Sequence, residues 1–220
     1  MNWEAFKAYD IRGVYPDDID EKGYYRIAKA YVYLFKPKTM VLGMDARLSS
    51  PPLKAALSQG FVDAGVDVID IGKITTDMLY FAVGEYGYSG GIVVSASHNP
   101  KQYNGMKLVR EKVTAISSDT GLFDIRDVVK EGKDESVTSD KKGTVTERDI
   151  LDDYLRYVLK SIDTSKIKRF RFVGNANFGY VSRGVAKLVK DLNLDLLPQN
   201  FEPDGSFPKG QPDPMQPGNR

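Results

Sequence analysis

The sequence predicts an α/β protein in which a mixed, largely parallel sheet flanked by helices is followed by an incomplete second α/β domain. Three observations support this prediction. Short β-branched runs alternate with amphipathic stretches through the first half of the chain, a rhythm typical of largely parallel sheets. A separate strand-helix-strand pattern begins after residue 147. The final stretch, residues 209–220, is too rich in proline and glycine to form a regular element.

The first elements follow from the spacing of apolar residues. Residues 20–35 carry apolar side chains at helical intervals, and Pro37 ends this predicted helix. Three more elements are expected before residue 75: a strand over 39–43, a helix that includes 52–64 and a strand over 66–72. A helix then opens at 75–82, with Thr76 or Asp77 as its cap.

A core strand that ends at a turn organises the middle of the chain. Gly90 and Gly91 interrupt the preceding helix, and Ile92–Val94 has the β-branched residues of a short buried strand. The polar residues 95–100 then turn the chain. Ser97 is therefore expected just beyond the carboxyl end of a core strand, where open α/β sheets bind their ligands.

The chain is expected to return beside that turn. Tyr103–Gly105 carries a second turn signal, and residues 106–109 alternate as in a strand, so Lys107 points back toward Ser97. The only histidine, His98, lies in the same turn. Such a group permits phosphoryl transfer, because cations and backbone N–H groups stabilise a phosphate. An ordinary polar turn explains the same spacing, and spacing alone does not decide between the two interpretations.

Two motifs favour the phosphoryl-transfer interpretation over the ordinary turn. Residues 95–100 read Ser-Ala-Ser-His-Asn-Pro, and residues 103–107 read Tyr-Asn-Gly-Met-Lys. Together they resemble the phosphoserine loop of the α-D-phosphohexomutases, the phosphomannomutase and phosphoglucomutase superfamily. The resemblance implies that Ser97 carries the transferable phosphate and that His98 and Lys107 contact it. It also makes Lys107 the candidate for proton transfer.

The first residues strengthen this resemblance. Residues 6–13, Phe-Lys-Ala-Tyr-Asp-Ile-Arg-Gly, are similar to the opening signature of the phosphomannomutase/phosphoglucomutase branch, in which the arginine touches the phosphoserine. A guanidinium on a tight turn suits bidentate phosphate contact, although a surface ion pair would also explain Arg12. The resemblance further assigns Tyr9 and Asn99 to phosphate or substrate binding. A phosphoglucosamine mutase, which typically opens with Thr-Asp-Gly-Ile-Arg-Gly, is the related alternative.

A second arginine is predicted at the same edge of the sheet. The pattern Gly-x-Asp-x-Arg over residues 43–47 begins at the end of a predicted strand and resembles the family pattern. Arg47 is therefore a candidate phosphate contact. A structural contact between Asp45 and Arg47 explains the pattern equally well.

Composition limits the possible partners and the compartment. Lys and Arg number 31 against 30 Asp and Glu, and a net charge of +1 gives no overall field that favours nucleic acid or an anionic membrane. The absence of cysteine excludes disulfides, thiolate catalysis and Cys-type zinc sites. No signal core or run of transmembrane length is present, and we interpret the protein as cytoplasmic.

A second domain is expected to begin just before an amphipathic helix over 149–162, where the pattern of elements starts again. The chain is thus divided into 1–147, which resembles phosphohexomutase domain I, and 148–220, a partial domain II. Its elements are expected as a strand over 170–174, a helix over 181–192 and a strand over 194–197. Residues 203–208 resemble the loop that precedes the family's metal site. The resemblance implies a Mg²⁺ ion held by the phosphate on Ser97 and by acidic ligands outside this chain.

The implied activity is reversible phosphoryl transfer between Ser97 and a mannose or glucose phosphate, through a hexose bisphosphate. Little or no turnover is expected from this chain alone, because the family's acidic loop, sugar-reading domain and phosphate-binding domain do not appear in it. The alternative is a non-enzymatic module that completes a mutase with a missing C-terminal portion or a second chain. A serine hydrolase is disfavoured, because Ser97 lacks the flanking glycines of a nucleophile elbow.

Overall fold

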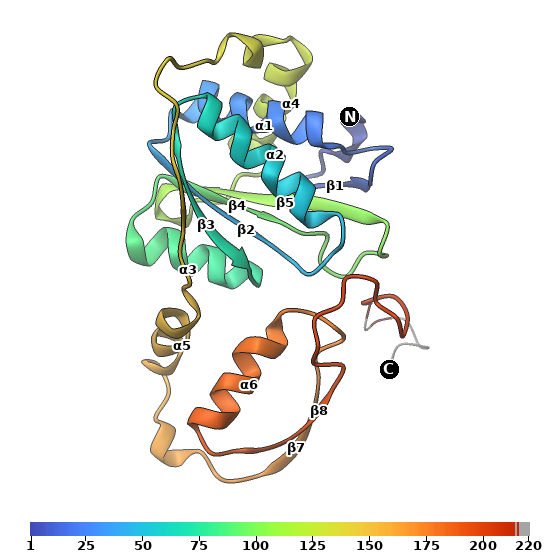
Figure 1. The fold of residues 1–220 in the computed structure, drawn as a ribbon, viewed down its shortest axis with the longest axis vertical. Coiled ribbons are helices and arrows are strands. Elements are labelled where there is room, and N and C mark those ends of the chain that lie inside the picture. The colour runs from blue at the N-terminus through green and yellow to red at the C-terminus, as the bar shows by residue number, and fades with distance from the viewer. Residues whose placement is uncertain (214, 216–220) are drawn as a thin grey trace.

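The computed structural model describes residues 1–213 and 215 and shows two parts of unequal size (Figure 1). The larger part contains a six-stranded sheet of order β1-β5-β4-β2-β3-β6, and the smaller part contains the pair β7-β8. The strands are β1 (Ile11–Val14), β2 (Thr39–Met44), β3 (Asp67–Lys73), β4 (Gly90–Val94), β5 (Tyr103–Arg110), β6 (Val145–Glu147), β7 (Arg171–Asn175) and β8 (Asp195–Gln199). The helices are α1 (Glu21–Phe35), α2 (Ser50–Asp63), α3 (Thr76–Tyr86), α4 (Phe123–Lys130), α5 (Leu151–Leu159) and α6 (Val181–Asp191).

The six-stranded sheet is mixed, as the sequence predicts. The strands β2, β3, β4 and β6 run parallel, whereas β5 pairs antiparallel with both β4 and β1. Met44 at the end of β2 lies opposite Val94 at the end of β4, and Asp45 N–H donates to the Val94 carbonyl at 2.9 Å. The chain segments that follow β2 and β4 therefore leave the sheet side by side, at the edge where ligands are sought.

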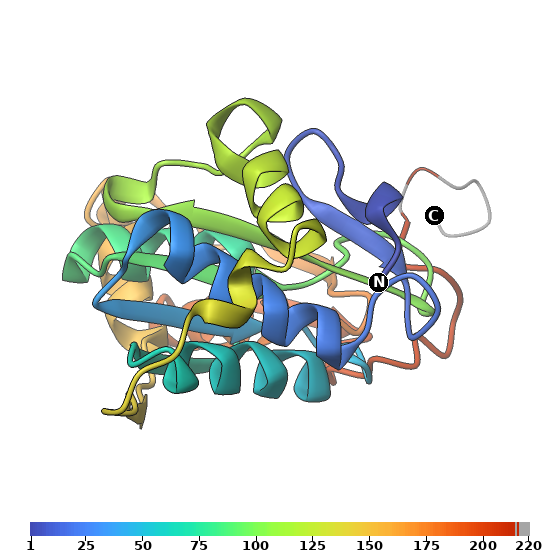
Figure 2. The same cartoon turned by 90° about the horizontal axis from the view of Figure 1, so that it is seen from above.

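Helices cover both faces of this sheet (Figures 1 and 2). The helices α1, α2 and α4 lie on one face, over a core that includes Tyr24, Phe61 and Ile92. The helix α3 lies on the other face with α5 beside it, over a core that includes Leu79 and Val93. Ile92 and Val93 are neighbours in β4, and their side chains enter opposite cores because successive residues of a strand point to opposite faces.

The predicted helix over 20–35 is confirmed to within one residue. The Asp20 carboxylate caps α1 by accepting the Gly23 N–H at 2.7 Å, and Lys36 adopts a left-handed φ of 47° at the other end. With 15 residues, α1 is the longest of the described helices. Across residues 1–213 and 215, no helix is both long enough and apolar enough to cross a membrane.

The strand predicted over Ile92–Val94 already begins at Gly90. Gly90 and Gly91 are buried residues of β4. A Cβ on Gly90 would lie 2.3 Å from the Tyr31 hydroxyl, and one on Gly91 would lie 2.8 Å from Leu79. The two faces of the strand are approached so closely by α1 and α3 that only glycine fits.

The turn predicted over Tyr103–Gly105 is wrong, because these residues already belong to β5. Gly105 lies opposite Arg12 in β1, and a Cβ there would lie 2.0 Å from the Ile11 carbonyl oxygen. The Asn104 amide is fully buried and donates to the hydroxyls of Ser49 and Ser50. At the start of α3 the cap is Thr75, one residue before the predicted positions.

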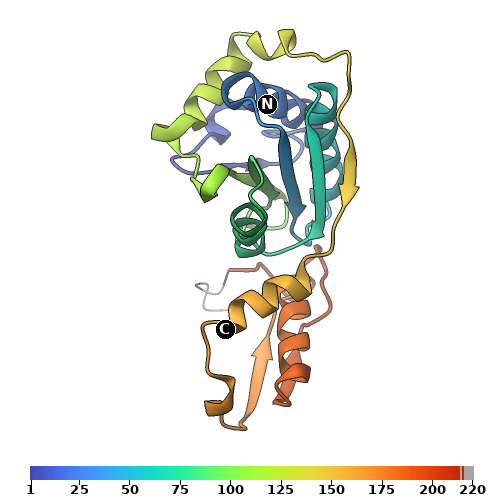
Figure 3. The same cartoon turned by 90° about the vertical axis from the view of Figure 1, so that its left-hand side faces the viewer.

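The smaller part follows α5 and lies below the sheet in Figure 3. Its strands β7 and β8 run parallel and are connected through α6, which confirms the predicted strand-helix-strand unit. The irregular stretch predicted over 209–220 has no helix or strand in residues 209–213, and residues 214 and 216–220 lie outside the described residues. The predicted domain boundary between residues 147 and 148 stays a prediction.

One carboxylate, Asp67, binds the residue that precedes the edge strand β6. This contact predicts an acid-sensitive contribution to the stability of the fold. Thr144, next to β6, donates its N–H and its hydroxyl to Asp67 Oδ1 at 2.8 and 2.7 Å. These two hydrogen bonds, the hydroxyl's first, lower the pKa of Asp67 from its ordinary 3.8. The stabilisation is therefore fully present above pH 3.8 and is lost as the pH falls through the lowered value.

We expect Asp67→Ala to lower the free energy of unfolding at pH 7, and the difference from the wild type to narrow as the pH falls below 3.8. Urea unfolding of both proteins at pH 7 and at a pH below 3.8 measures the difference in the free energy of unfolding. Asp17→Ala, at an exposed position, is the matched control. A difference that stays constant across this pH range would contradict the assigned role of Asp67.

Candidate active site

Ser97 lies in the turn that follows β4 and faces solvent. Its φ of 54° is left-handed, which is uncommon for a residue other than glycine. Two hydrogen bonds within the turn help to hold it: Ser97 N–H donates to the Ser95 side-chain Oγ at 3.0 Å, and Asn99 N–H donates to the Ala96 carbonyl at 3.0 Å. The Ser97 hydroxyl lies 3.3 Å from His98 Nδ1. The serine and the histidine are therefore adjacent and both accessible to a ligand.

Arg47 supports this turn from below. It is 1% exposed, and its guanidinium donates to the carbonyl oxygens of Ser97, Asn99, Pro100 and Tyr103 at 2.9, 2.7, 2.7 and 3.0 Å. The remaining N–H, on Nε, donates to Asp45 Oδ2 at 3.2 Å. All five guanidinium N–H groups thus have protein acceptors. The contact between Asp45 and Arg47, which also explains the sequence pattern over 43–47, is present. Arg47 acts on the turn by donating to backbone carbonyl oxygens.

Burial has an electrostatic consequence at this position. It lowers the pKa of the Arg47 guanidinium, while the Asp45 carboxylate opposes that shift. Arginine stays charged at any physiological pH, so a fixed positive charge lies directly beneath the turn. No N–H of Arg47 is left to bind a phosphate oxygen directly in this arrangement, and its predicted phosphate contact stays a prediction.

Asp10 connects two cations that come from different strands. Its carboxylate is 3% exposed, and Oδ2 accepts from Arg12 Nε at 2.9 Å and from Lys107 Nζ at 3.2 Å. We call Asp10, Arg12 and Lys107 the charged triad. Asp10 lies within the motif over 6–13, which predicts no role for it. Its position before Ile11, at the start of β1, is the only signal that the sequence offers.

Arg12 also reaches the turn itself. Its Nη1 donates to the Ala96 carbonyl at 3.1 Å and to the Asn99 side-chain oxygen. The side chain of Asn99 therefore binds Arg12 in this structure. Tyr9 is 67% exposed, and Lys107 Nζ lies 5.3 Å from the centre of its ring. Arg12 and Arg47 thus bind the turn directly, whereas Lys107 and Tyr9 are connected to it only through Asp10 and Arg12. The roles of the predicted site residues toward a substrate stay predictions.

A cavity of about 280 Å³ opens between this turn and the smaller part of the protein. Its lining includes Ser95 and Ser97 from the turn, Thr75 before α3, and Asn177 and Tyr180 before α6. These five side chains offer hydroxyl or amide groups, and the lining also includes the carboxylate of Asp45 and apolar side chains such as Ile74 and Phe207. The cavity can therefore receive a polar ligand next to the Ser97 hydroxyl.

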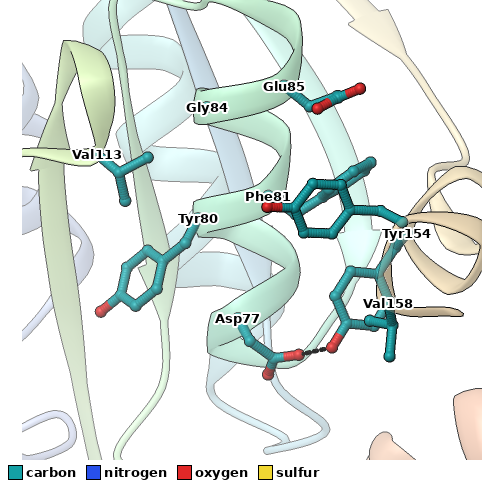
Figure 4. A pocket seen from close by; sticks show the side chains of 9 residues that line it. Asp77, Tyr80, Phe81, Gly84, Glu85, Val113, Tyr154 and Val158 are labelled. Carbon is teal, nitrogen blue, oxygen red and sulfur yellow. Dashed lines mark hydrogen bonds between the residues drawn. The ribbon is translucent and has the colours of Figure 1, made fainter. Parts of the chain in front are cut away.

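A larger cavity, of about 540 Å³, lies between α3 and α5 (Figure 4). Tyr80 and Phe81 line it with Tyr154, whose hydroxyl donates to Asp77. Burial is the largest cause that raises the pKa of the Tyr154 hydroxyl, and the bond to Asp77 adds to it. Asp77 and Glu85 are the ionisable carboxylates of its lining. We place the candidate site at the smaller cavity, because of the two it is the one that Ser97 lines.

The described residues do not form a metal site by themselves. In residues 1–213 and 215, no group of three or more His, Asp or Glu side chains is arranged to hold a metal ion. Hard cations such as Mg²⁺ prefer several oxygen ligands. The Mg²⁺ implied by the resemblance would therefore need ligands beyond Ser97 and its phosphate.

We expect Asp10→Asn to weaken the fold, because it leaves two neighbouring cations without their shared carboxylate. The free energy of unfolding should fall by about 1–3 kcal/mol, the cost of breaking a largely buried ion pair whose cations remain partly solvated. Urea unfolding at pH 7 measures the change. Asp17→Asn, at an exposed aspartate, provides the control, and equal effects of the two substitutions would show that the charged triad contributes nothing.

Comparisons with known proteins show what the chain is similar to. A family model described as phosphoglucomutase/phosphomannomutase, alpha/beta/alpha domain I, matches residues 4–136. A phosphomannomutase of Salmonella montevideo is 42% identical over 98% of this chain, and phosphohexose mutases of Xanthomonas campestris are 44% identical over 100%. The chain covers 48% and 49% of these two relatives, about half of their length.

Solved structures show the same fold. A crystal structure of a phosphoglucomutase/phosphomannomutase family protein from Burkholderia thailandensis has a TM-score of 0.87 at 30% identity, over all of this chain and 48% of that one. A putative phosphomannomutase from Thermus thermophilus shares the fold with a TM-score of 0.83 at 23% identity, over 96% of this chain and 48% of that one. The chain therefore belongs to the phosphoglucomutase/phosphomannomutase family.

Proposed function

We propose that this chain corresponds to the N-terminal part of a phosphohexomutase, in which Ser97 holds the phosphoryl group exchanged with a hexose phosphate. The observation that supports the proposal best is the surrounding of the Ser97 turn. An exposed hydroxyl in a left-handed turn lies beside a cavity, above the buried guanidinium of Arg47, while Arg12 binds the same turn. Curated relatives named phosphomannomutase and phosphohexose mutases support the substrate class.

The transfer step needs no oxidant and no second reactant beyond the sugar. A hydroxyl of the hexose monophosphate attacks the phosphorus of phosphorylated Ser97. The new sugar O–P bond forms while the Oγ–P bond breaks, and the proton of the sugar hydroxyl ends on Ser97 Oγ. The product is a hexose bisphosphate, which returns its other phosphoryl group to Ser97 by the reverse step. Mannose and glucose phosphates are the proposed substrates, with glucosamine phosphate as the alternative.

Each nearby group has a part in this proposal. Arg12 and the backbone N–H groups of the turn stabilise the charge on the equatorial phosphate oxygens as the phosphorus moves. His98 Nδ1, 3.3 Å from the Ser97 hydroxyl, supplies a further donor when it is protonated. Lys107 is the group that we propose for moving the proton, and Asp10 keeps its ammonium next to Arg12.

Mg²⁺ is part of the proposal only as a charge stabiliser. A bound divalent ion neutralises charge on a transferring phosphoryl group. Because residues 1–213 and 215 supply no cluster of acidic ligands, we derive no step through the metal. Its remaining ligands are proposed to come from the part of the relatives that this chain does not cover.

The proposal predicts phosphate on one serine. Incubation with glucose 1,6-bisphosphate and Mg²⁺, with and without the complementary half of a relative, should add the mass of one phosphoryl group to the chain. Intact-mass measurement and peptide mapping should locate it on Ser97. Ser97→Ala should abolish the gain, whereas Ser161→Ala, an exposed serine outside the turn, should keep it. Absence of phosphate on Ser97 under both conditions would overturn the proposed function.

We also expect the 220-residue chain alone to show little or no interconversion of mannose or glucose 1-phosphate and 6-phosphate. The reason is that the proposed transfer needs metal ligands, and residues 1–213 and 215 contain no cluster of acidic side chains arranged to hold a metal ion. A coupled assay of 6-phosphate formation measures this. Sustained turnover that disappears with Ser97→Ala would show that the chain is sufficient, contrary to this expectation.

A further inference from the structure

A segment of the smaller part lies directly on Arg47. Gly205 forms an isolated parallel β-bridge with Arg47, and the ring of Phe207 lies 5.3 Å from the guanidinium carbon. We call residues 204–207 the covering segment. Asp204 N–H donates to the Phe178 carbonyl at 3.0 Å, so the covering segment is tied to the turn between β7 and α6. It therefore joins the smaller part to the support of the Ser97 turn.

The contact at Gly205 is close enough to require glycine. This residue is buried, and a Cβ on it would lie 2.2 Å from the Ala46 carbonyl oxygen and 2.7 Å from Arg47 Cα. Both of these are backbone atoms, which cannot move aside as the end of a flexible side chain can. The backbone of the covering segment thus packs against the backbone of the residue that holds the turn.

The contact at Phe207 is held in place by an uncommon backbone conformation. Phe207 has a φ of 48°, in the left-handed region that a bulky residue rarely adopts. Three hydrogen bonds stabilise this conformation: Ser206 N–H to Asp204 Oδ1 at 2.8 Å, Phe207 N–H to the Asp204 carbonyl at 3.1 Å, and Gly210 N–H to the Phe207 carbonyl at 3.1 Å. An outlier of this kind persists only where its surroundings hold it. The result is an aromatic face above a buried cation.

Arg47 connects the ring of Phe207 with the Ser97 turn. Its edge carries the N–H groups that bind the carbonyls of Ser97, Asn99, Pro100 and Tyr103. A planar guanidinium can bind acceptors at its edge and stack on an aromatic ring at its face at the same time. A tilt of the plane would lengthen several of these hydrogen bonds together. A ring that lies against the guanidinium limits such a tilt.

We propose that Gly205 and Phe207 are positioning residues for the Ser97 turn. They fix the guanidinium plane of Arg47 and thereby the conformation in which Ser97 presents its hydroxyl. The coupling is reciprocal, so a change in the turn also alters how firmly the smaller part is held. The significance of this contact for catalysis rests on the proposed function, but the contact and its effect on the turn do not.

Hydrogen exchange of the 220-residue chain, followed by mass spectrometry, tests this inference. The Ser97, Asn99 and Tyr103 amides all donate to protein acceptors, so peptides covering residues 95–103 report the order of the turn. We expect Phe207→Leu, which keeps apolar volume but removes the ring, to raise exchange there by about 3- to 10-fold, the size expected for a partly buried cation–π contact. Phe207→Tyr should restore exchange to the wild-type rate.

Two control substitutions separate positioning from general loosening. Phe170→Leu removes a ring that is 65% exposed in the same part of the protein and should leave residues 95–103 unchanged. Gly205→Ala should act like Phe207→Leu, whereas Gly184→Ala, whose Cβ would meet nothing closer than 3.8 Å, should not. If Gly205→Ala does not fold, the Leu and Tyr variants of Phe207 carry the test alone.

The inference is overturned if Phe207→Leu leaves exchange in residues 95–103 at the wild-type rate. It is equally overturned if Phe207→Tyr behaves like Phe207→Leu, or if exchange rises in α1 and in the turn by the same factor. None of these readouts involves phosphate. A chain in which Ser97 takes no phosphate, but Phe207→Leu still loosens the turn and Phe207→Tyr restores it, would refute the proposed function and leave the positioning role standing.

Discussion

The conformation of the Ser97 turn depends on the hydrogen bonds of one buried guanidinium. The carbonyl oxygens of a turn lack the strand partners that satisfy backbone groups inside a sheet, so each needs another donor. Arg47 supplies donors to four residues at once from a position that is 1% exposed. A lysine, with a single compact ammonium on a flexible stem, could not meet this geometry. Because the support comes from beneath, the hydroxyl of Ser97 is left to face solvent.

The backbone conformation of the Ser97 turn and the positions of the nearby cations depend on different residues. Arg47 fixes the backbone, whereas Asp10 fixes the cations Arg12 and Lys107 through a carboxylate that is 3% exposed. Neither system uses the hydroxyl of Ser97 as a partner. The serine can therefore gain or lose a covalent group without breaking the hydrogen bonds that hold its surroundings, as a carrier of a transferable group requires.

Local features of the fold were predictable from the sequence, and features set by distant contacts were not. The helix α1 (Glu21–Phe35) follows from apolar spacing and from the cap at Asp20, both of which act within a few residues. The strand positions of Gly90 and Gly105 were missed because they depend on close approach by Tyr31 and by the backbone of Ile11. The family motifs identified the residues around the turn, but no local pattern marks Asp10 as the partner of a lysine 97 positions later.

The composition of the charged triad bears on how firmly a phosphate can be held. Two cations share one carboxylate, which leaves a single net positive charge on the triad. A phosphoserine carries about −1.5 to −2 at pH 7. Under the proposed function, the triad by itself would compensate only part of that charge, and the remainder is the charge that the proposal assigns to a bound Mg²⁺.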